Sequence, residues 1–231
     1  MWGRLKEFFS SEPSEHYLSV FLVMLCIELF VFGPLAHVGG SLAAYANGIV
    51  FSFLMLFGVL AMTAHPKVQI VSAMVVTLAV AFRWITNFVD SPQVFLGSMF
   101  FSLSSILIFL VIVLGQVYKE GPVTVHRIQG AIAAYLLFAM SFSITYNIIE
   151  FLHPGSFVFP SQQHPLQPNQ MESFLYFSIS TLTTVGFGDI TAVHSIARSL
   201  VMLESVIGSL YPPILIGILV SLHIRWRWDK K

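Results

Sequence analysis

Six long apolar runs constrain this chain more than any other feature of its sequence. A helix needs about 20 mostly apolar residues to cross the hydrocarbon core of a bilayer. The runs that reach this length are residues 17–35, 42–64, 68–89, 94–118, 125–152 and 192–224. The composition, with 56% hydrophobic and 10% charged residues, differs from that of soluble domains, in which about a quarter of the residues are charged. We therefore expect an all-α integral membrane protein with six transmembrane helices.

A shorter apolar segment, residues 171–183, lies between the fifth and sixth runs. It is too short to cross the bilayer, so we expect it to enter the membrane and return to the same side. Backbone that turns back at this depth is tolerated only where protein or a water-filled path surrounds it. The sequence therefore predicts a re-entrant helix and loop that line such a path.

Lysine and arginine predict the orientation of the chain, because cytoplasmic loops carry an excess of them. If both termini are cytoplasmic, nine of the eleven basic residues fall on the inner side. These are Arg4, Lys6, Lys67, Lys119, Arg127, Arg225, Arg227, Lys230 and Lys231. The re-entrant loop then opens to the outside of the cell (plasma) membrane. The net charge of zero gives no reason to expect a nucleic-acid partner.

The residues that follow the re-entrant helix, 183–189, read TTVGFGD. A potassium ion loses its hydration shell in a narrow pore, and rings of backbone carbonyl groups can replace that shell. Successive carbonyl groups point to one side only if the backbone alternates in conformation, and glycine adopts positive φ without steric cost. Gly186 and Gly188 alternate with Val185 and Phe187 in this way. The carbonyl end of the preceding helix would add a negative partial charge that favours a cation.

The longer run YFSISTLTTVGFGDI, residues 176–190, resembles the pore helix and selectivity filter of the potassium channel superfamily. Together with the helices on either side, the resemblance covers residues 125–224, a little under half of the chain. It implies a selectivity filter formed by Thr184, Val185, Gly186, Phe187 and Gly188, with potassium bound at the first four. It implies supporting roles around the filter for Thr183, Asp189, Tyr176, Phe177 and Ser180. Phe187 departs from the commoner tyrosine, and Ser180 stands where some members have a buried carboxylate.

A single filter motif without an internal repeat predicts assembly, because a ring of carbonyl groups needs several copies of the loop. We expect a homotetramer of subunits with a cytoplasmic segment (1–16), a four-helix sensor-like domain (17–118) and a pore domain (119–231). Its expected partners are potassium ions and the lipid bilayer, with no cofactor and no enzymatic activity. A weakly selective cation channel and a potassium-uptake transporter are the alternatives. Thr183, Thr184 and Asp189 argue against the first, and the single pore loop against the second.

The fourth run, residues 94–118, contains no charged residue, and a membrane field acts only on charge. We therefore expect a channel that is not voltage-gated in the usual way, and its stimulus stays open. Glu28 and Arg83 lie within other runs, and a structural ion pair between them is expected because charges at this depth need partners.

Three residues of the sixth run, Gly208, Pro212 and Pro213, predict a hinge for an inner gate, with a static bend as the alternative. Glu204 in the same run either neutralises Arg198 or contacts the pore helix of a neighbouring subunit. Sensing of pH or ions by Glu204, or by the loop histidines His153 and His164, is left open.

Overall fold

The computed structural model describes residues 16–38, 40–62, 66–89, 91–119, 123–160 and 171–229. The predicted cytoplasmic segment lies outside these residues except for His16, and so does His164. The chain divides into a larger unit, residues 1–137 with 218–231, and a smaller unit, residues 138–217. This division falls within a helix, so the predicted domains 17–118 and 119–231 stay a prediction.

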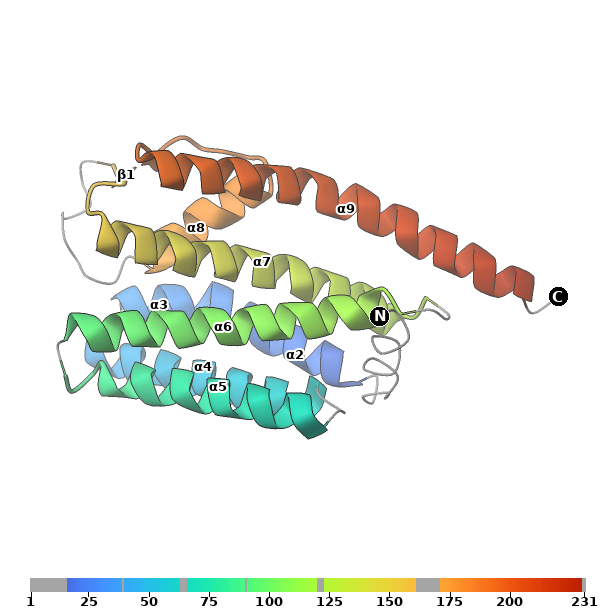
Figure 1. The fold of residues 1–231 in the computed structure, drawn as a ribbon, viewed down its shortest axis with the longest axis horizontal. Coiled ribbons are helices and arrows are strands. Elements are labelled where there is room, and N and C mark those ends of the chain that lie inside the picture. The colour runs from blue at the N-terminus through green and yellow to red at the C-terminus, as the bar shows by residue number, and fades with distance from the viewer. Residues whose placement is uncertain are drawn as a thin grey trace. The chain divides into compact units, whose positions relative to one another are not determined.

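The larger unit is a bundle of helices that run alongside one another (Figure 1). Its elements are α2 (His16–Ile27), the π-helical segment η1 (Glu28–Phe32), α3 (Gly33–Val38), α4 (Gly40–Met62), α5 (Pro66–Ile85), α6 (Pro92–Val117), the first part of α7 (Val125–Leu152) and the end of α9 (Ser195–Asp229) after Gly217. Proline opens both α5 and α6, where its missing N–H costs no helical hydrogen bond.

Phe109 of α6 is buried where α6 meets α2 and α4 in this bundle. Its fully buried ring meets the ring of Phe21 on α2 edge to face, with the centroids 6.0 Å apart. A Cβ atom on Gly58 of α4 would lie 2.9 Å from the same ring. Glycine at this position therefore lets α4 approach α6 closely, as small residues do where membrane helices pack.

The smaller unit contains the rest of α7, then β1 (Phe157–Val158), α8 (Met171–Leu182), β2 (Thr191–Ala192) and the part of α9 (Ser195–Asp229) that ends at Gly217. The two short strands pair antiparallel, with Phe157 opposite Ala192. The sixth predicted helix therefore begins at Ser195 and not at residue 192, because residues 191–192 extend to pair with β1.

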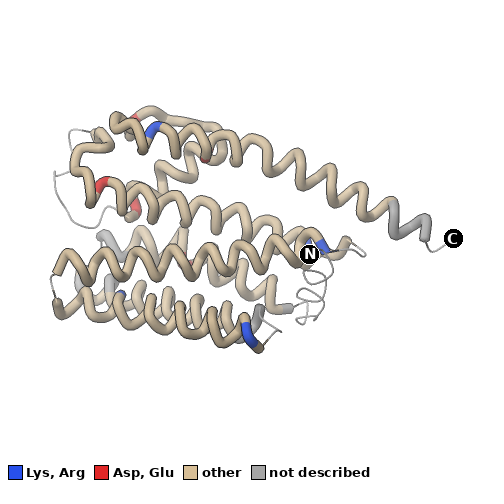
Figure 2. Tube along the Cα trace, viewed as in Figure 1, with Lys and Arg blue, Asp and Glu red and all other residues tan. Residues whose placement is uncertain are grey.

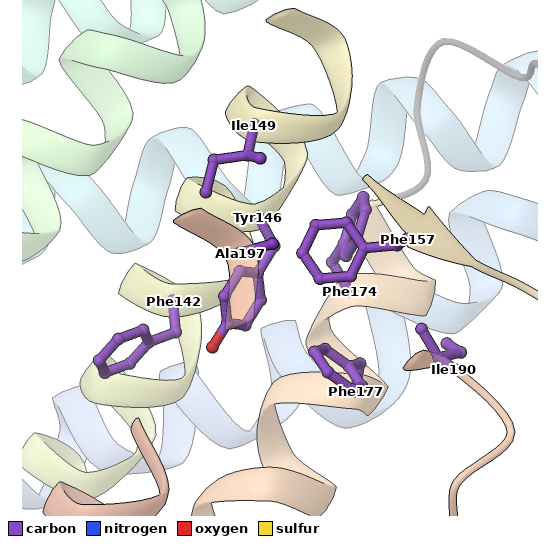
Figure 3. Packing of buried hydrophobic residues seen from close by; sticks show 8 residues of the cluster. All are labelled: Phe142, Tyr146, Ile149, Phe157, Phe174, Phe177, Ile190 and Ala197. Atoms are coloured by element: carbon purple, nitrogen blue, oxygen red, sulfur yellow. The ribbon is translucent and has the colours of Figure 1, made fainter. Parts of the chain in front are cut away.

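An aromatic cluster forms the core of the smaller unit (Figure 3). The ring of Tyr146 on α7 lies 5.4 Å from that of Phe157 on β1 and 5.5 Å from that of Phe177 on α8. Phe157 and Phe174 meet edge to face at 4.9 Å. Side chains from α7, β1 and α8 thus bury one another and fix the position of α8.

Five helices of the described residues are long and apolar enough to cross a membrane. They are Tyr17–Leu35, Pro66–Ile85, Pro92–Val117, Val125–Leu152 and Ser195–Ile224. Charged residues are sparse along them, and α6 has none (Figure 2). The second predicted span, residues 42–64, corresponds to α4, whose apolar stretch Tyr45–Val59 is shorter than a full span. A membrane crossing by α4, and with it the total of six, stays a prediction.

Candidate functional site

The loop after α8 is held by the carbonyl groups at the end of that helix. The backbone N–H groups of Val185 and Gly186 both donate to the carbonyl oxygen of Ser180, at 2.9 and 3.0 Å. The N–H of Thr184 donates to the carbonyl oxygen of Thr181 at 2.9 Å. Any displacement of the last turn of α8 therefore moves residues 184–186 with it.

The backbone of this loop alternates in handedness. Thr184, Gly186 and Gly188 have positive φ values of 62°, 55° and 77°, while the residues between them do not. The positive φ predicted for the two glycines is thus confirmed, and Thr184 extends the pattern by one position. A Cβ atom on either glycine would meet nothing within 4 Å, so the requirement for glycine is one of backbone conformation alone.

Thr184 is the strained member of the series. A β-branched residue at positive φ is an outlier whose cost is about 1–3 kcal/mol. Thr184 is the single non-glycine residue of the described chain with this conformation. Such strain persists where the surrounding structure enforces it, and it gathers at functional sites.

The loop lies on the surface of the single chain. All residues from Thr183 to Asp189 are exposed, including the apolar side chains of Val185 (57%) and Phe187 (66%). The apolar side chains of this loop are therefore open to contacts from outside the described chain.

The predicted supporting residues divide between the loop and the core. Tyr176 stacks on Phe187, with ring centroids 5.7 Å apart, and hydrogen-bonds to Asp189. Desolvation and this hydrogen bond with the carboxylate raise the pKa of the Tyr176 hydroxyl. Phe177 instead joins the aromatic cluster, and the Ser180 hydroxyl donates within α8 to the carbonyl oxygen of Phe177 at 3.0 Å. The Tyr176 side chain thus links α8 to Phe187 and Asp189 of the loop.

Glu204 lies behind the loop and not beside Arg198. Its side chain is 0% exposed, and the Tyr146 hydroxyl donates to Glu204 Oε2 at 2.6 Å. Ser178 Oγ of α8 hydrogen-bonds to Glu204 Oε1, whereas Arg198 Nε donates to the carbonyl oxygen of Ala192 at 3.0 Å. The prediction that Glu204 neutralises Arg198 is therefore wrong. In this structure Glu204 contacts α8 of its own chain.

Sequence reasoning missed Tyr146 and Ser178 as the partners of Glu204. A carboxyl group within an apolar run is itself a signal, because such groups need polar partners at membrane depth. The partners lie 58 and 26 residues away along the chain, so no spacing rule points to them.

The predicted hinge residues lie within one continuous helix, α9, with both Pro212 and Pro213 inside it. A Cβ atom on Gly208 would lie 2.0 Å from the carbonyl oxygen of Leu182, the last residue of α8. Gly208 therefore marks the contact between α9 and the end of α8. Hinge motion at these residues stays a prediction.

Glu28 and Arg83, the predicted ion pair, lie in the larger unit. Arg83 Nη2 donates to Asn47 Oδ1 at 2.6 Å, and the guanidinium lies 4.5 Å from the centroid of the Phe51 ring. Glu28 is 5% exposed, and its Oε2 has no hydrogen-bond partner within the described residues. The two charges attract each other electrostatically, but the direct contacts of the Arg83 guanidinium are the Asn47 amide and the Phe51 ring.

Comparison with known families adds one finding. Residues 131–224 match a protein family described as ion channel. The match contains α8, the loop that follows it and most of α7 and α9. No curated protein and no solved structure matches the chain.

Proposed function

We propose that this chain, of which residues 131–224 match an ion channel family, forms a potassium-selective pore with residues 184–188 as the selectivity filter. The observation that carries the proposal is the alternating handedness at Thr184, Gly186 and Gly188, in a loop that reads TTVGFGD. A backbone that alternates in this way turns successive carbonyl oxygens to one side. Rings of such oxygens replace the hydration shell of a potassium ion.

Potassium is the transported ion and needs no further cofactor. Its binding positions in the proposed filter are the carbonyl oxygens of residues 184–187, and the Thr184 hydroxyl adds a ligand at the inner end. Tyr176 and Asp189 hold the outer end through their hydrogen bond and the stacking on Phe187. The strain at Thr184 is then the cost of a preformed coordination shell.

We propose a homotetramer, because one chain supplies one loop and a ring needs several. The exposed Val185 and Phe187 support this, since apolar side chains in such a loop are buried only when further copies close around it. The excess of basic residues on one side supports a plasma-membrane protein with both termini in the cytoplasm.

The proposed channel conducts passively and is not gated by voltage in the usual way. Moving one charge across 100 mV is worth about 2.3 kcal/mol, and α6 carries no charge to move. Arg83, in the last turn of α5, is held by a hydrogen bond to Asn47 and by the ring of Phe51.

Purified protein in planar bilayers with unequal potassium and sodium on the two sides tests the proposal. We expect a reversal potential close to the potassium equilibrium potential. A reversal potential near zero with measurable current would indicate a weakly selective cation channel. No ionic current under any condition would overturn the channel function itself.

A further inference from the structure

The hydrogen bonds around the carboxyl group of Glu204 need one more proton than the neighbouring hydroxyl groups supply. Tyr146 donates its hydroxyl proton to Oε2, and Ser178 Oγ contacts Oε1. Ser178 Oγ also lies 2.8 Å from the carbonyl oxygen of Ala139 on α7. All of these side chains are fully buried in the smaller unit.

Counting protons assigns the state of this group. A hydroxyl carries a single proton, and a carbonyl oxygen can only accept. The three hydrogen bonds need three protons, and the hydroxyls of Tyr146 and Ser178 supply two. The third must come from Glu204, whose protonated Oε1 donates to Ser178 Oγ while Ser178 donates to Ala139.

The electrostatic surroundings favour the same state. A buried carboxylate is costly unless a positive charge pairs with it. On α7 the titratable group that faces Glu204 is Tyr146, and on α8 its contact is the Ser178 hydroxyl. Within the described residues no charged side chain acts on Glu204, and Arg198 on α9 is bound to a backbone carbonyl group.

We propose that Glu204 binds a proton and that the protonated side chain is a positioning residue for the filter. It ties α9 to Ser178, and Ser178 in turn ties α8 to the Ala139 carbonyl group of α7. The carbonyl oxygen of Ser180, two residues further along the same helix, holds the N–H groups of Val185 and Gly186. The proton therefore fixes the helix end from which the filter is suspended.

Loss of the proton changes this connection. Ser178 then turns its single hydrogen from Ala139 to the carboxylate, so the link from α8 to α7 breaks. Because the proton is lost as pH rises, conduction falls with rising pH. This inference rests on the proposed channel function and adds its regulation by protons.

The substitution Glu204→Gln isolates the proton. Its amide N–H₂ donates to Ser178 and its amide oxygen accepts from Tyr146, so it reproduces the hydrogen bonds of the protonated acid without titrating. The matched control is Glu172→Gln, the same chemical change at a partly exposed position of α8.

Potassium current is then measured for the full-length channel between about pH 5 and about pH 9, the range in which buried carboxyl groups titrate. We expect the current of the unsubstituted protein and of E172Q to fall about tenfold toward the alkaline end, the effect of one lost hydrogen bond. The current of E204Q should stay constant within about twofold.

A second variant should shift the pH profile in one predicted direction. Tyr146→Phe removes a donor that stabilises the carboxylate more than the acid. We expect the midpoint of the pH profile to move upward by roughly one pH unit. An unchanged or lower midpoint would overturn the inference, even if E204Q failed to assemble.

Infrared spectroscopy provides a readout that does not depend on conduction. At neutral pH the carbonyl-stretch band of a protonated carboxylic acid should be weaker in E204Q than in the unsubstituted protein and in E172Q. A flat pH profile of the unsubstituted channel, or a profile of E204Q that matches it, would overturn the role of the proton. Failure of the reversal potential to follow potassium would instead overturn the proposed function, whatever the pH profile.

Discussion

Gly186 is the position at which the filter assignment is most directly tested. Its φ of 55° is a conformation that side chains with a Cβ atom rarely adopt, and no neighbouring atom lies within 4 Å of the place that a methyl group would take. Alanine at residue 186 therefore meets no steric obstacle, and its whole effect comes from the backbone. The cost of this conformation for an L-residue is about 1–2 kcal/mol.

In a tetramer each of the four subunits would carry this cost. The conformation in which all four loops keep positive φ at residue 186 is then disfavoured by about 4–8 kcal/mol. We expect G186A channels to lose selective potassium conduction, because the backbone relaxes and its carbonyl groups turn away.

Gly155 offers a matched control for this substitution. It also has positive φ, 85°, and open space where a Cβ atom would lie, but it belongs to the turn between α7 and β1. G155A should therefore lose similar stability in each subunit and keep its selectivity. The assay compares the ratio of potassium to sodium permeability with the thermal unfolding of each variant. Retained selectivity in G186A, or equal loss in both variants, would refute the reasoning.

Three further predictions follow from contacts in the two units. Gly208→Ala places a methyl group against the Leu182 carbonyl group and should lower the free energy of unfolding by about 1–3 kcal/mol. Gly217→Ala, with open space around it on the same helix, should be neutral or stabilising by up to about 1 kcal/mol; thermal unfolding distinguishes the two, and equal effects would contradict the close contact. Asn47→Ala removes the acceptor of Arg83 and should cost about 1–3 kcal/mol, whereas an unchanged unfolding temperature would show that the bond is dispensable. Open probability should depend only shallowly on voltage in single-channel recordings, and a steep activation curve would reveal charges other than those of α6.

Features that depend on neighbouring residues were predictable from the sequence. The candidate spans Tyr17–Leu35 and Val125–Leu152 have the limits expected from their apolar runs, because hydrophobic length is a local property. A helix, Met171–Leu182, occupies the apolar segment 171–183, and its entry into the membrane stays a prediction. The positive φ of Gly186 and Gly188 also follows from the residue type itself.

Features that depend on distant residues were not predictable. The pairing of β1 with β2 removed residues 191–192 from the expected sixth helix. Arg83 was expected to pair with Glu28, yet Asn47 reaches its guanidinium group. Asparagine offered no signal in the sequence, because one amide within an apolar run is as consistent with a helix-packing contact as with a partner for a charge.

Two contacts between α9 and α8 connect α9 to the end of α8, from which the loop continues. Gly208 removes a side chain so that the helix backbone can approach the carbonyl group of Leu182, while Glu204, one turn earlier, reaches Ser178. The contact at Gly208 is steric and does not involve a proton, whereas the contact at Glu204 depends on the proton that we propose it binds. The carbonyl oxygen of Ser180 lies between these two contacts along α8 and carries the N–H groups of Val185 and Gly186. In the proposed channel, the contact at Gly208 stays the same at every pH and the contact at Glu204 does not, so a change of pH would act on the proposed filter without a moving charge in α6.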